Sequence, residues 1–151
     1  GPGDLLKRKT DCAKGDIVTQ NGEKVGSHEG IFHYTIGQRR GLGVCDATPF
    51  YVTGLNAEKK QVIVGKEADL WHRELLVRKV NWIVGGAPKL PARFAVKIRY
   101  RHQAAPAELY QDGELLRVIF EQAQRAITPG QFAVFYENDE VIGGGEIVSR
   151  A

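Results

Sequence analysis

The sequence predicts a mainly β fold, because short strand-like runs alternate with turns and helical periodicity is scarce. Three turn signals support this prediction: Asn21-Gly22, Asp112-Gly113 and Asn138-Asp139 each stand between two extended runs. Asparagine, aspartate and glycine favour such turns, and Asn-Gly in particular supplies the positive φ angles that a tight hairpin requires. The pattern is typical of a small barrel or sandwich.

Two hairpins are expected in the N-terminal half. The stretch "DIVTQNGEKVG", residues 16–26, places Asn21-Gly22 between two short extended runs. The stretch "PFYVTGLNAEKKQVIVG", residues 49–65, repeats the design with a polar tip, Asn-Ala-Glu-Lys-Lys. Each run is short enough to be one strand of a small sheet.

From Leu75 the strand pattern continues in four segments: residues 75–83, 92–100, 107–120 and 131–148. In the second segment an apolar set alternates with a largely basic set, which predicts a half-buried strand with a cationic outer face. The apolar set is Phe94, Val96, Ile98 and Tyr100, and the other set is Ala95, Lys97, Arg99 and Arg101. Only "KEADLWHREL", residues 66–75, and "EQAQRAI", residues 121–127, suggest a short turn or helix.

The chain offers two positions for a domain boundary. One is the glycine- and proline-containing stretch "WIVGGAPKLPA", residues 82–92, and the other lies at residues 66–74, after the second hairpin. The earlier position is favoured, because residues 75–83 look like the first strand of a second unit. We therefore expect one unit over residues 1–73 and another over residues 74–151.

Composition places the chain among ordinary globular proteins, with 151 residues, 42% hydrophobic and 26% charged. No apolar run has the length of a membrane-spanning helix, and the N-terminal residues lack the apolar segment of a secretory signal. A cytoplasmic protein without a membrane partner is expected. Cys12 and Cys45 form no C-x-x-C pair, and we expect free thiols.

Signals for catalysis are missing from the sequence. The four histidines are scattered without metal-ligand spacing, so no metal site is expected. The stretch "VGKEAD" has a Gly-Lys pair but lacks the earlier glycine and the following hydroxyl of a phosphate-binding loop. No catalytic residue and no cofactor are therefore expected in this chain, which reads as a binding module.

Basic residues gather in two acid-free stretches. Residues 93–102 hold four of them, and "GQRRGLG", residues 37–43, adds Arg39 and Arg40 beside Gln38. The glycine spacing of the second stretch differs from G-x-G-x-x-G and no βαβ pattern surrounds it, which excludes a dinucleotide loop. With a net charge of +3, these stretches are either solvated faces or a surface for a polyanion.

Four motifs in order resemble the bacterial tRNA-specific 2-thiouridylase family. They are "GDIVTQNGEKVGSHEGIFHYTIGQRRGLGV", "VKIRYRHQAAPAEL", "AITPGQFAVFY" and "VIGGGEI", which together span residues 15–147. The resemblance covers the family's central and C-terminal domains only. It implies a small β-rich central domain followed by a six-stranded antiparallel β-barrel.

The resemblance also implies what the parent protein does. Members of the family use ATP to activate the wobble uridine of certain tRNA anticodons, and a cysteine persulfide supplies the sulfur that gives 2-thiouridine. The nucleotide-binding domain, with its S-G-G-x-D-S loop and two catalytic cysteines, has no match here, and Cys12 does not fit the second cysteine. The implied partners are tRNA, that domain and a sulfur-donor protein, and the fragment alone is expected to be inactive.

By the resemblance, Arg99, Tyr100 and Gln131 match the family's tRNA-contacting residues. Lys97 and Arg101 share the basic strand, and we expect them to contact tRNA as well. An arginine can grip a phosphate and a tyrosine ring can stack on an unpaired base. Strict alternation, however, turns Tyr100 toward the apolar face, so a strand end or a bulge is needed there.

For Gln38, Arg39 and Arg40 the resemblance leaves two roles open: contact with tRNA, or packing against the nucleotide-binding domain. Gly37, Gly41 and Gly43 are expected to let the backbone turn tightly around them. The alternative for the whole chain is a stand-alone module that binds RNA or protein and has no sulfurtransferase activity.

Overall fold

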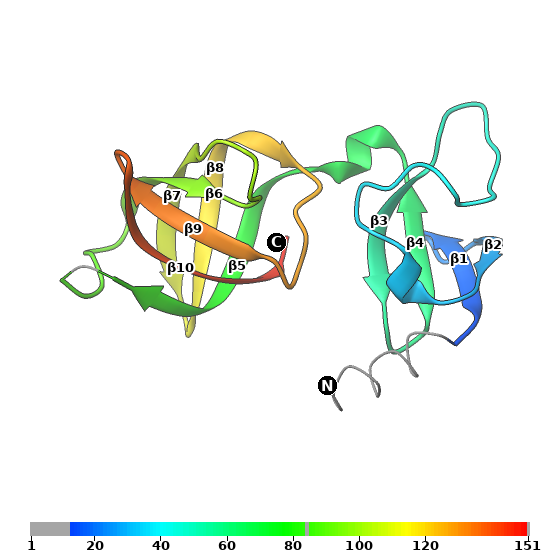
Figure 1. The fold of residues 1–151 in the computed structure, drawn as a ribbon, viewed down its shortest axis with the longest axis horizontal. Helices are drawn as coiled ribbons and strands as arrows, with labels where there is room; N and C mark the ends of the chain where they lie inside the picture. The colour runs from blue at the N-terminus through cyan, green and yellow to red at the C-terminus, as the bar shows by residue number, and fades with distance from the viewer. Residues whose placement is uncertain (1–12, 84, 151) are drawn as a thin grey trace. The chain divides into compact units, whose positions relative to one another are not determined.

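The computed structural model describes residues 13–83 and 85–150, and Cys12 lies outside them. The chain divides into two compact units, Gly1–Leu70 and Trp71–Ala151. The division falls at the start of a strand, three residues before the boundary expected from the sequence. Figure 1 shows the strands of each unit.

The first unit is a four-stranded sheet with the order β2-β1-β4-β3. Its elements are β1 (Gly15–Thr19), β2 (Lys24–His28), the 3-10 turn η1 (Ile31–His33), β3 (Tyr51–Asn56), β4 (Gln61–Gly65) and the 3-10 turn η2 (Glu67–Leu70). Both predicted hairpins are confirmed, and β1 and β4 join them as a parallel pair. Gly22 has a φ of 86°, as the turn of the first hairpin requires.

The second unit is a closed barrel with the strand order β10-β5-β8-β7-β6-β9. The strands are β5 (Trp71–Trp82), β6 (Ala92–Lys97), β7 (Ala105–Asp112), β8 (Leu115–Arg125), β9 (Phe132–Glu137) and β10 (Glu140–Ser149). Every neighbouring pair is antiparallel, which confirms the predicted six-stranded barrel.

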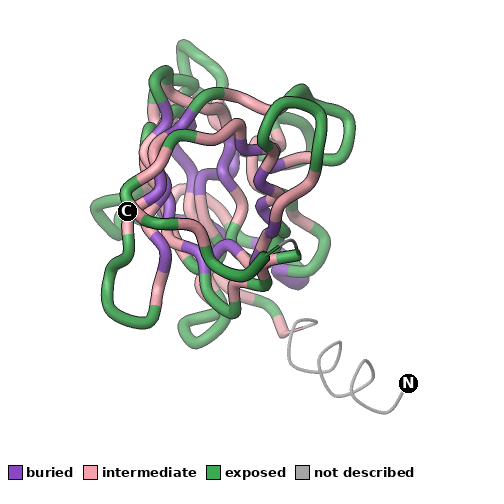
Figure 2. Tube along the Cα trace, turned by 90° about the vertical axis from the view of Figure 1, so that its left-hand side faces the viewer, coloured by how far each residue is buried: buried purple, intermediate pink, exposed green. Residues whose placement is uncertain are grey.

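Alternate residues of the barrel strands point inward, and Phe120 and Phe135 are the largest fully buried side chains of its core. Figure 2 shows buried positions along the strands and exposed positions along the connecting loops. The core of the first unit is smaller and includes Ile17, Val52 and Val62.

One local prediction was wrong, and two others were met in part. Residues 121–125 continue strand β8, because Arg125 and Gln124 pair with Trp71 and His72 of β5 and this pairing outweighs the helical preference of the sequence. Within residues 66–75, the expected short turn is the 3-10 turn η2, and strand β5 begins directly after it. The strand expected over residues 92–100 ends earlier, at Lys97, and this is the strand end that Tyr100 was expected to need.

Three consecutive glycines let β10 close the barrel. A Cβ at Gly144 would lie 2.6 Å from the Ala133 carbonyl oxygen, and one at Gly143 would lie 2.7 Å from the Asn81 carbonyl oxygen. At Gly145 it would lie 2.6 Å from Val77 Cγ1 and 2.7 Å from the Arg78 carbonyl oxygen. The strand therefore has no room for side chains where it crosses its two neighbours, which gives the "GGG" motif a packing role.

Replacement of Gly145 by alanine is expected to lower the free energy of unfolding of the barrel by about 1–3 kcal/mol, because the new methyl overpacks against β5. Both tryptophans of the chain lie in β5, so urea unfolding followed by tryptophan fluorescence reports on the barrel. The control is Gly113→Asn, at a left-handed turn position with open space around it. Equal stability of Gly145→Ala and wild type would contradict the packing role.

Candidate nucleic-acid interface

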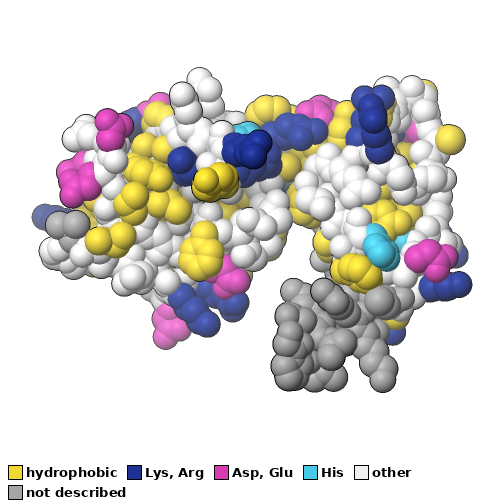
Figure 3. Space-filling model, in the orientation of Figure 1, with side chains coloured by type: hydrophobic (Ala, Val, Ile, Leu, Met, Phe, Trp, Pro, Cys, Tyr) yellow, Lys and Arg dark blue, Asp and Glu magenta, His cyan; other side chains and the backbone are white. Residues whose placement is uncertain are grey.

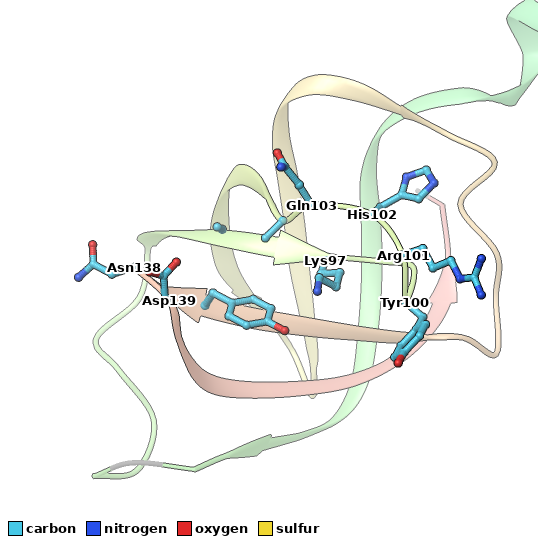
Figure 4. A pocket seen from close by; sticks show the side chains of 10 residues that line it. Lys97, Tyr100, Arg101, His102, Gln103, Asn138 and Asp139 are labelled. Carbon is cyan, nitrogen blue, oxygen red and sulfur yellow. The ribbon is translucent and has the colours of Figure 1, made fainter.

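An open groove of about 500 Å³ lies on the barrel beside the end of β6. Its polar and aromatic lining comes from β6, from the loop that follows it, and from β9 with its turn into β10; it includes Lys97, Tyr100, Arg101, His102, Gln103 and Tyr136. Figure 4 shows Tyr100 and Arg101 at one end, Asn138 and Asp139 at the other, and Lys97 between them. The groove thus brings together three of the five predicted tRNA-binding residues.

Lys97 and Tyr136 face each other across the β6–β9 pair. The Lys97 ammonium lies over the Tyr136 ring, 5.4 Å from its centroid. Within residues 13–83 and 85–150, the Lys97 side chain forms no ion pair and no hydrogen bond with another residue. Its charge is therefore held in place by an aromatic face and is not neutralised by a neighbouring carboxylate.

Tyr100 and Arg101 project from the loop that follows β6. Because the strand ends at Lys97, the Tyr100 side chain escapes the apolar face and is 92% exposed. Arg101 is also exposed, and within the described ranges its guanidinium has no acidic partner. A ring and a cation thus stand next to each other in solvent, and Figure 3 shows basic and hydrophobic side chains intermingled on the barrel unit.

Arg99 differs from its neighbours, because its side chain is turned into the protein. Its Nη2 donates hydrogen bonds to the carbonyl oxygens of Arg125 and Ala126, the latter at 2.6 Å. Burial, and secondarily the charge of Arg125, lowers the pKa of the Arg99 guanidinium. The prediction that Arg99 lies on a solvent-facing cationic strand is wrong in this respect.

Gln131 stands at the start of β9 and is exposed. Its backbone is fixed by two hydrogen bonds to β10: Gly130 N–H donates to the Ile147 carbonyl at 2.8 Å, and Ile147 N–H donates to the Gln131 carbonyl at 2.8 Å. Strand β6 pairs with β9 through Val96 with Phe135 and Lys97 with Val134. This register places the Tyr100 segment and Gln131 at the same end of the strand pair.

Sequence reasoning missed Phe132 and Tyr136. Phe132 directly follows Gln131 and is 67% exposed, which is unusual for phenylalanine. Period-two alternation in "QFAVFY" could have found both, because Ala133 and Phe135 are buried, and Phe132 and Tyr136 alternate with them on the opposite face of the strand. Arg93, which belongs to the basic stretch, pairs instead with Glu121 of β8.

The loop Gly37–Gly43 of the first unit is held by side-chain hydrogen bonds of Gln38 and by backbone hydrogen bonds to Val52 of β3. Gln38 Oε1 accepts a hydrogen bond from Thr35 N–H at 3.0 Å, and Gln38 Nε2 donates to the Arg40 carbonyl at 2.8 Å. Leu42 is buried in the core of the unit. Gly37, Gly41 and Gly43 all have positive φ, as predicted. The amide of Gln38 therefore shapes the loop.

Arg39 and Arg40 are the residues that this loop presents. Both are exposed, and neither forms an ion pair within the described part of the chain. Two adjacent cations without a carboxylate suit either an RNA phosphate or an acidic protein surface.

Lys66 supports the segment that follows this loop. Its ammonium donates to Asp46 Oδ2 at 2.7 Å and to the Thr48 carbonyl at 3.0 Å, and it lies 3.8 Å from the centroid of the Phe50 ring. The hydrogen bond from Lys66, then that from Ala47 N–H and the Lys66 charge, hold the pKa of Asp46 below its usual value. This small network fixes the residues between the loop and β3.

Two family models match the chain. The Aminomethyltransferase beta-barrel domain covers residues 72–147, and the tRNA methyl transferase PRC-barrel domain covers residues 3–66. The tRNA-specific 2-thiouridylase MnmA of Solibacter usitatus is 49% identical over 137 residues, which are 88% of this chain and 37% of the relative. The chain belongs to the tRNA-specific 2-thiouridylase family.

Two further relatives of the same name agree. The 2-thiouridylase of Desulforudis audaxviator is 49% identical over 89% of this chain and 39% of its own length, and that of Trichormus variabilis is 44% identical over 89% and 38%. The chain thus spans about two fifths of the length of the 2-thiouridylases it matches.

Some kinds of site are not found in residues 13–83 and 85–150. There, no group of three or more His, Cys, Asp or Glu side chains is placed to hold a metal ion. Among the same residues, no helix is long and apolar enough to cross a membrane. Cys45 is exposed with a free thiol.

Asp46→Asn is expected to destabilise the first unit at pH 7 and to have no effect in strong acid. Because the folded state lowers the Asp46 pKa below its ordinary 3.8, the carboxylate contributes stability above that pH and loses it as the pH falls through the folded value. Thermal midpoints of the Val62 and Val64 methyl NMR signals, taken at pH 7, 4 and 2, measure this. A midpoint difference that does not change with pH would contradict the role of Lys66.

Proposed function

We propose that this chain is the tRNA-binding portion of a tRNA-specific 2-thiouridylase. The observation that carries the proposal is the barrel groove, where the unneutralised cations Lys97 and Arg101 stand beside the fully exposed ring of Tyr100. Cations suit the phosphates of a folded RNA, and an exposed ring suits an unstacked base of a loop. Gln131, at the same end of the strand pair, adds an amide that can read a base edge.

The whole protein would catalyse ATP-dependent 2-thiolation of the wobble uridine in the cytoplasm. The nucleotide-binding domain would supply the ATP site and the catalytic cysteines, and a sulfur-donor protein would load the persulfide. In this division of labour the two units described above hold the substrate, and the chain alone carries out no sulfur transfer.

Arg39 and Arg40 would contact either the tRNA or the nucleotide-binding domain. Their exposure suits both partners, because the loop that carries them is already held by Gln38. A double variant Arg39→Gln, Arg40→Gln separates the two: weaker tRNA binding by this chain assigns them to RNA, and unchanged binding assigns them to the domain surface.

Affinity of this chain for a tRNA transcript is expected to fall with salt, because each neutralised phosphate releases counterions. Lys97→Gln and Arg101→Gln should each weaken binding and reduce the slope of log affinity against log salt by about 0.7–0.9. Fluorescence anisotropy between 50 and 300 mM KCl measures this. The control is Lys89→Gln, which removes the same charge from the loop 85–91, outside the lining of the groove.

If Lys89→Gln reduces the salt slope as much as the two groove variants do, tRNA binding depends on the overall charge of the chain and not on the groove. Absence of binding in wild type would favour the alternative, a module for protein partners.

Tyr100→Ala is expected to weaken tRNA binding by about 1–3 kcal/mol, the usual range for one base stacked on an aromatic side chain. Tyr100→Phe keeps the ring and should bind as wild type does. Because Tyr100 is almost fully exposed, neither change should alter the thermal midpoint of the barrel. Equal losses in both variants would point to the hydroxyl instead of the ring.

A further inference from the structure

The Arg99 guanidinium uses one nitrogen to hold two consecutive carbonyls. Both hydrogen bonds, to Arg125 and to Ala126, come from Nη2. A guanidinium grips a phosphate with a pair of nitrogens, either Nη1 with Nη2 or Nε with Nη2. Nη2 belongs to both pairs, and both of its N–H groups already donate hydrogen bonds. Arg99 therefore cannot bind a phosphate in a bidentate manner.

The carbonyls that Arg99 holds lie at an unusual bend. Ala126 has a φ of 56°, a left-handed conformation that residues with a Cβ disfavour, and it is buried. Its carbonyl oxygen also accepts a hydrogen bond from Thr128 Oγ1 at 2.9 Å. Such a bend persists only where surrounding groups hold it, and the two donors do so here.

The bend directs the chain from β8 to the turn that ends in Gln131. Gln131 lies five positions after Ala126, and Arg99 directly precedes Tyr100. The Arg99 side chain therefore ties the segment that carries Tyr100 to the segment that carries Gln131. The two segments are far apart in the sequence. The register of the β6–β9 pair brings the end of β6, which leads to Tyr100, and the start of β9, which follows Gln131, to the same end of the pair.

We infer that Arg99 is a positioning residue: it sets the bend at Ala126 and thereby places Gln131 at the same end of the β6–β9 pair as Tyr100, and it is not a phosphate ligand. The effect of Arg99 on tRNA binding rests on the proposed function, but its effect on the bend at Ala126 can be tested without RNA. It separates two arginines that the sequence places side by side, because Arg101 keeps its guanidinium in solvent.

The first experiment compares Arg99→Gln with Arg101→Gln in tRNA binding by the full chain. Arg99→Gln should weaken binding about tenfold while keeping the wild-type salt slope, whereas Arg101→Gln should lower the slope by about 0.7–0.9. The double variant Arg99→Gln, Gln131→Ala should bind no more weakly than Arg99→Gln alone, because the two residues act through one arrangement. Equal slope losses in the two arginine variants, with additive effects of Gln131→Ala, would overturn the inference.

The second experiment needs no RNA. Amide hydrogen exchange of Gly130 and Ile147, whose N–H groups fix Gln131, should accelerate at least tenfold in Arg99→Gln and in the milder Thr128→Val. Arg101→Gln should leave both rates unchanged. Equal acceleration throughout the barrel in Arg99→Gln, with no local change in Thr128→Val, would overturn the inference.

The two readouts separate the inference from the function. If wild type binds no tRNA, the proposed function fails, and the exchange rates still decide whether Arg99 holds the bend. If tRNA binds and the exchange rates do not respond, the function stands and the positioning role fails.

Discussion

Closure of the barrel by β10 is the constraint on which the rest of the second unit depends. This strand pairs with β5 on one side and β9 on the other, and a Cβ on any of its three glycines would clash with a backbone oxygen of one neighbour. The position of β9 then fixes its register with β6. Since Lys97, Tyr136, Tyr100 and Gln131 belong to these two strands or their ends, the groove is a consequence of the closure.

Some of the described basic side chains form hydrogen bonds or ion pairs within the fold, and others form neither. Arg73, Arg78, Arg93 and Arg117 contact backbone carbonyls or carboxylates of other barrel strands. Lys97, Arg101, Arg39 and Arg40 have no such partner within the described residues. The modest net charge thus understates the local charge of the groove, because much of the positive charge elsewhere is neutralised in ion pairs.

Features that depend on neighbouring residues in the sequence could be predicted. The turns at Asn21-Gly22 and Asn138-Asp139, the hairpins around them and the exposed pair Arg39-Arg40 follow from local preference and alternation. The hydrogen bonds of Arg99 could not be predicted, because no sequence pattern connects it to the carbonyls of Arg125 and Ala126. The strand at residues 121–125 was missed for a similar reason, since pairing with β5 decides it.

The hydrogen bonds of Gln38 have a thermodynamic consequence. They order the backbone around Arg39 and Arg40 while the chain folds, so the entropy of fixing that loop is lost before any partner arrives. A partner then has to immobilise only two side chains, at a much smaller entropic cost than ordering a flexible loop. A rearrangement of the Gln38 contacts would therefore change affinity through preorganisation of the loop.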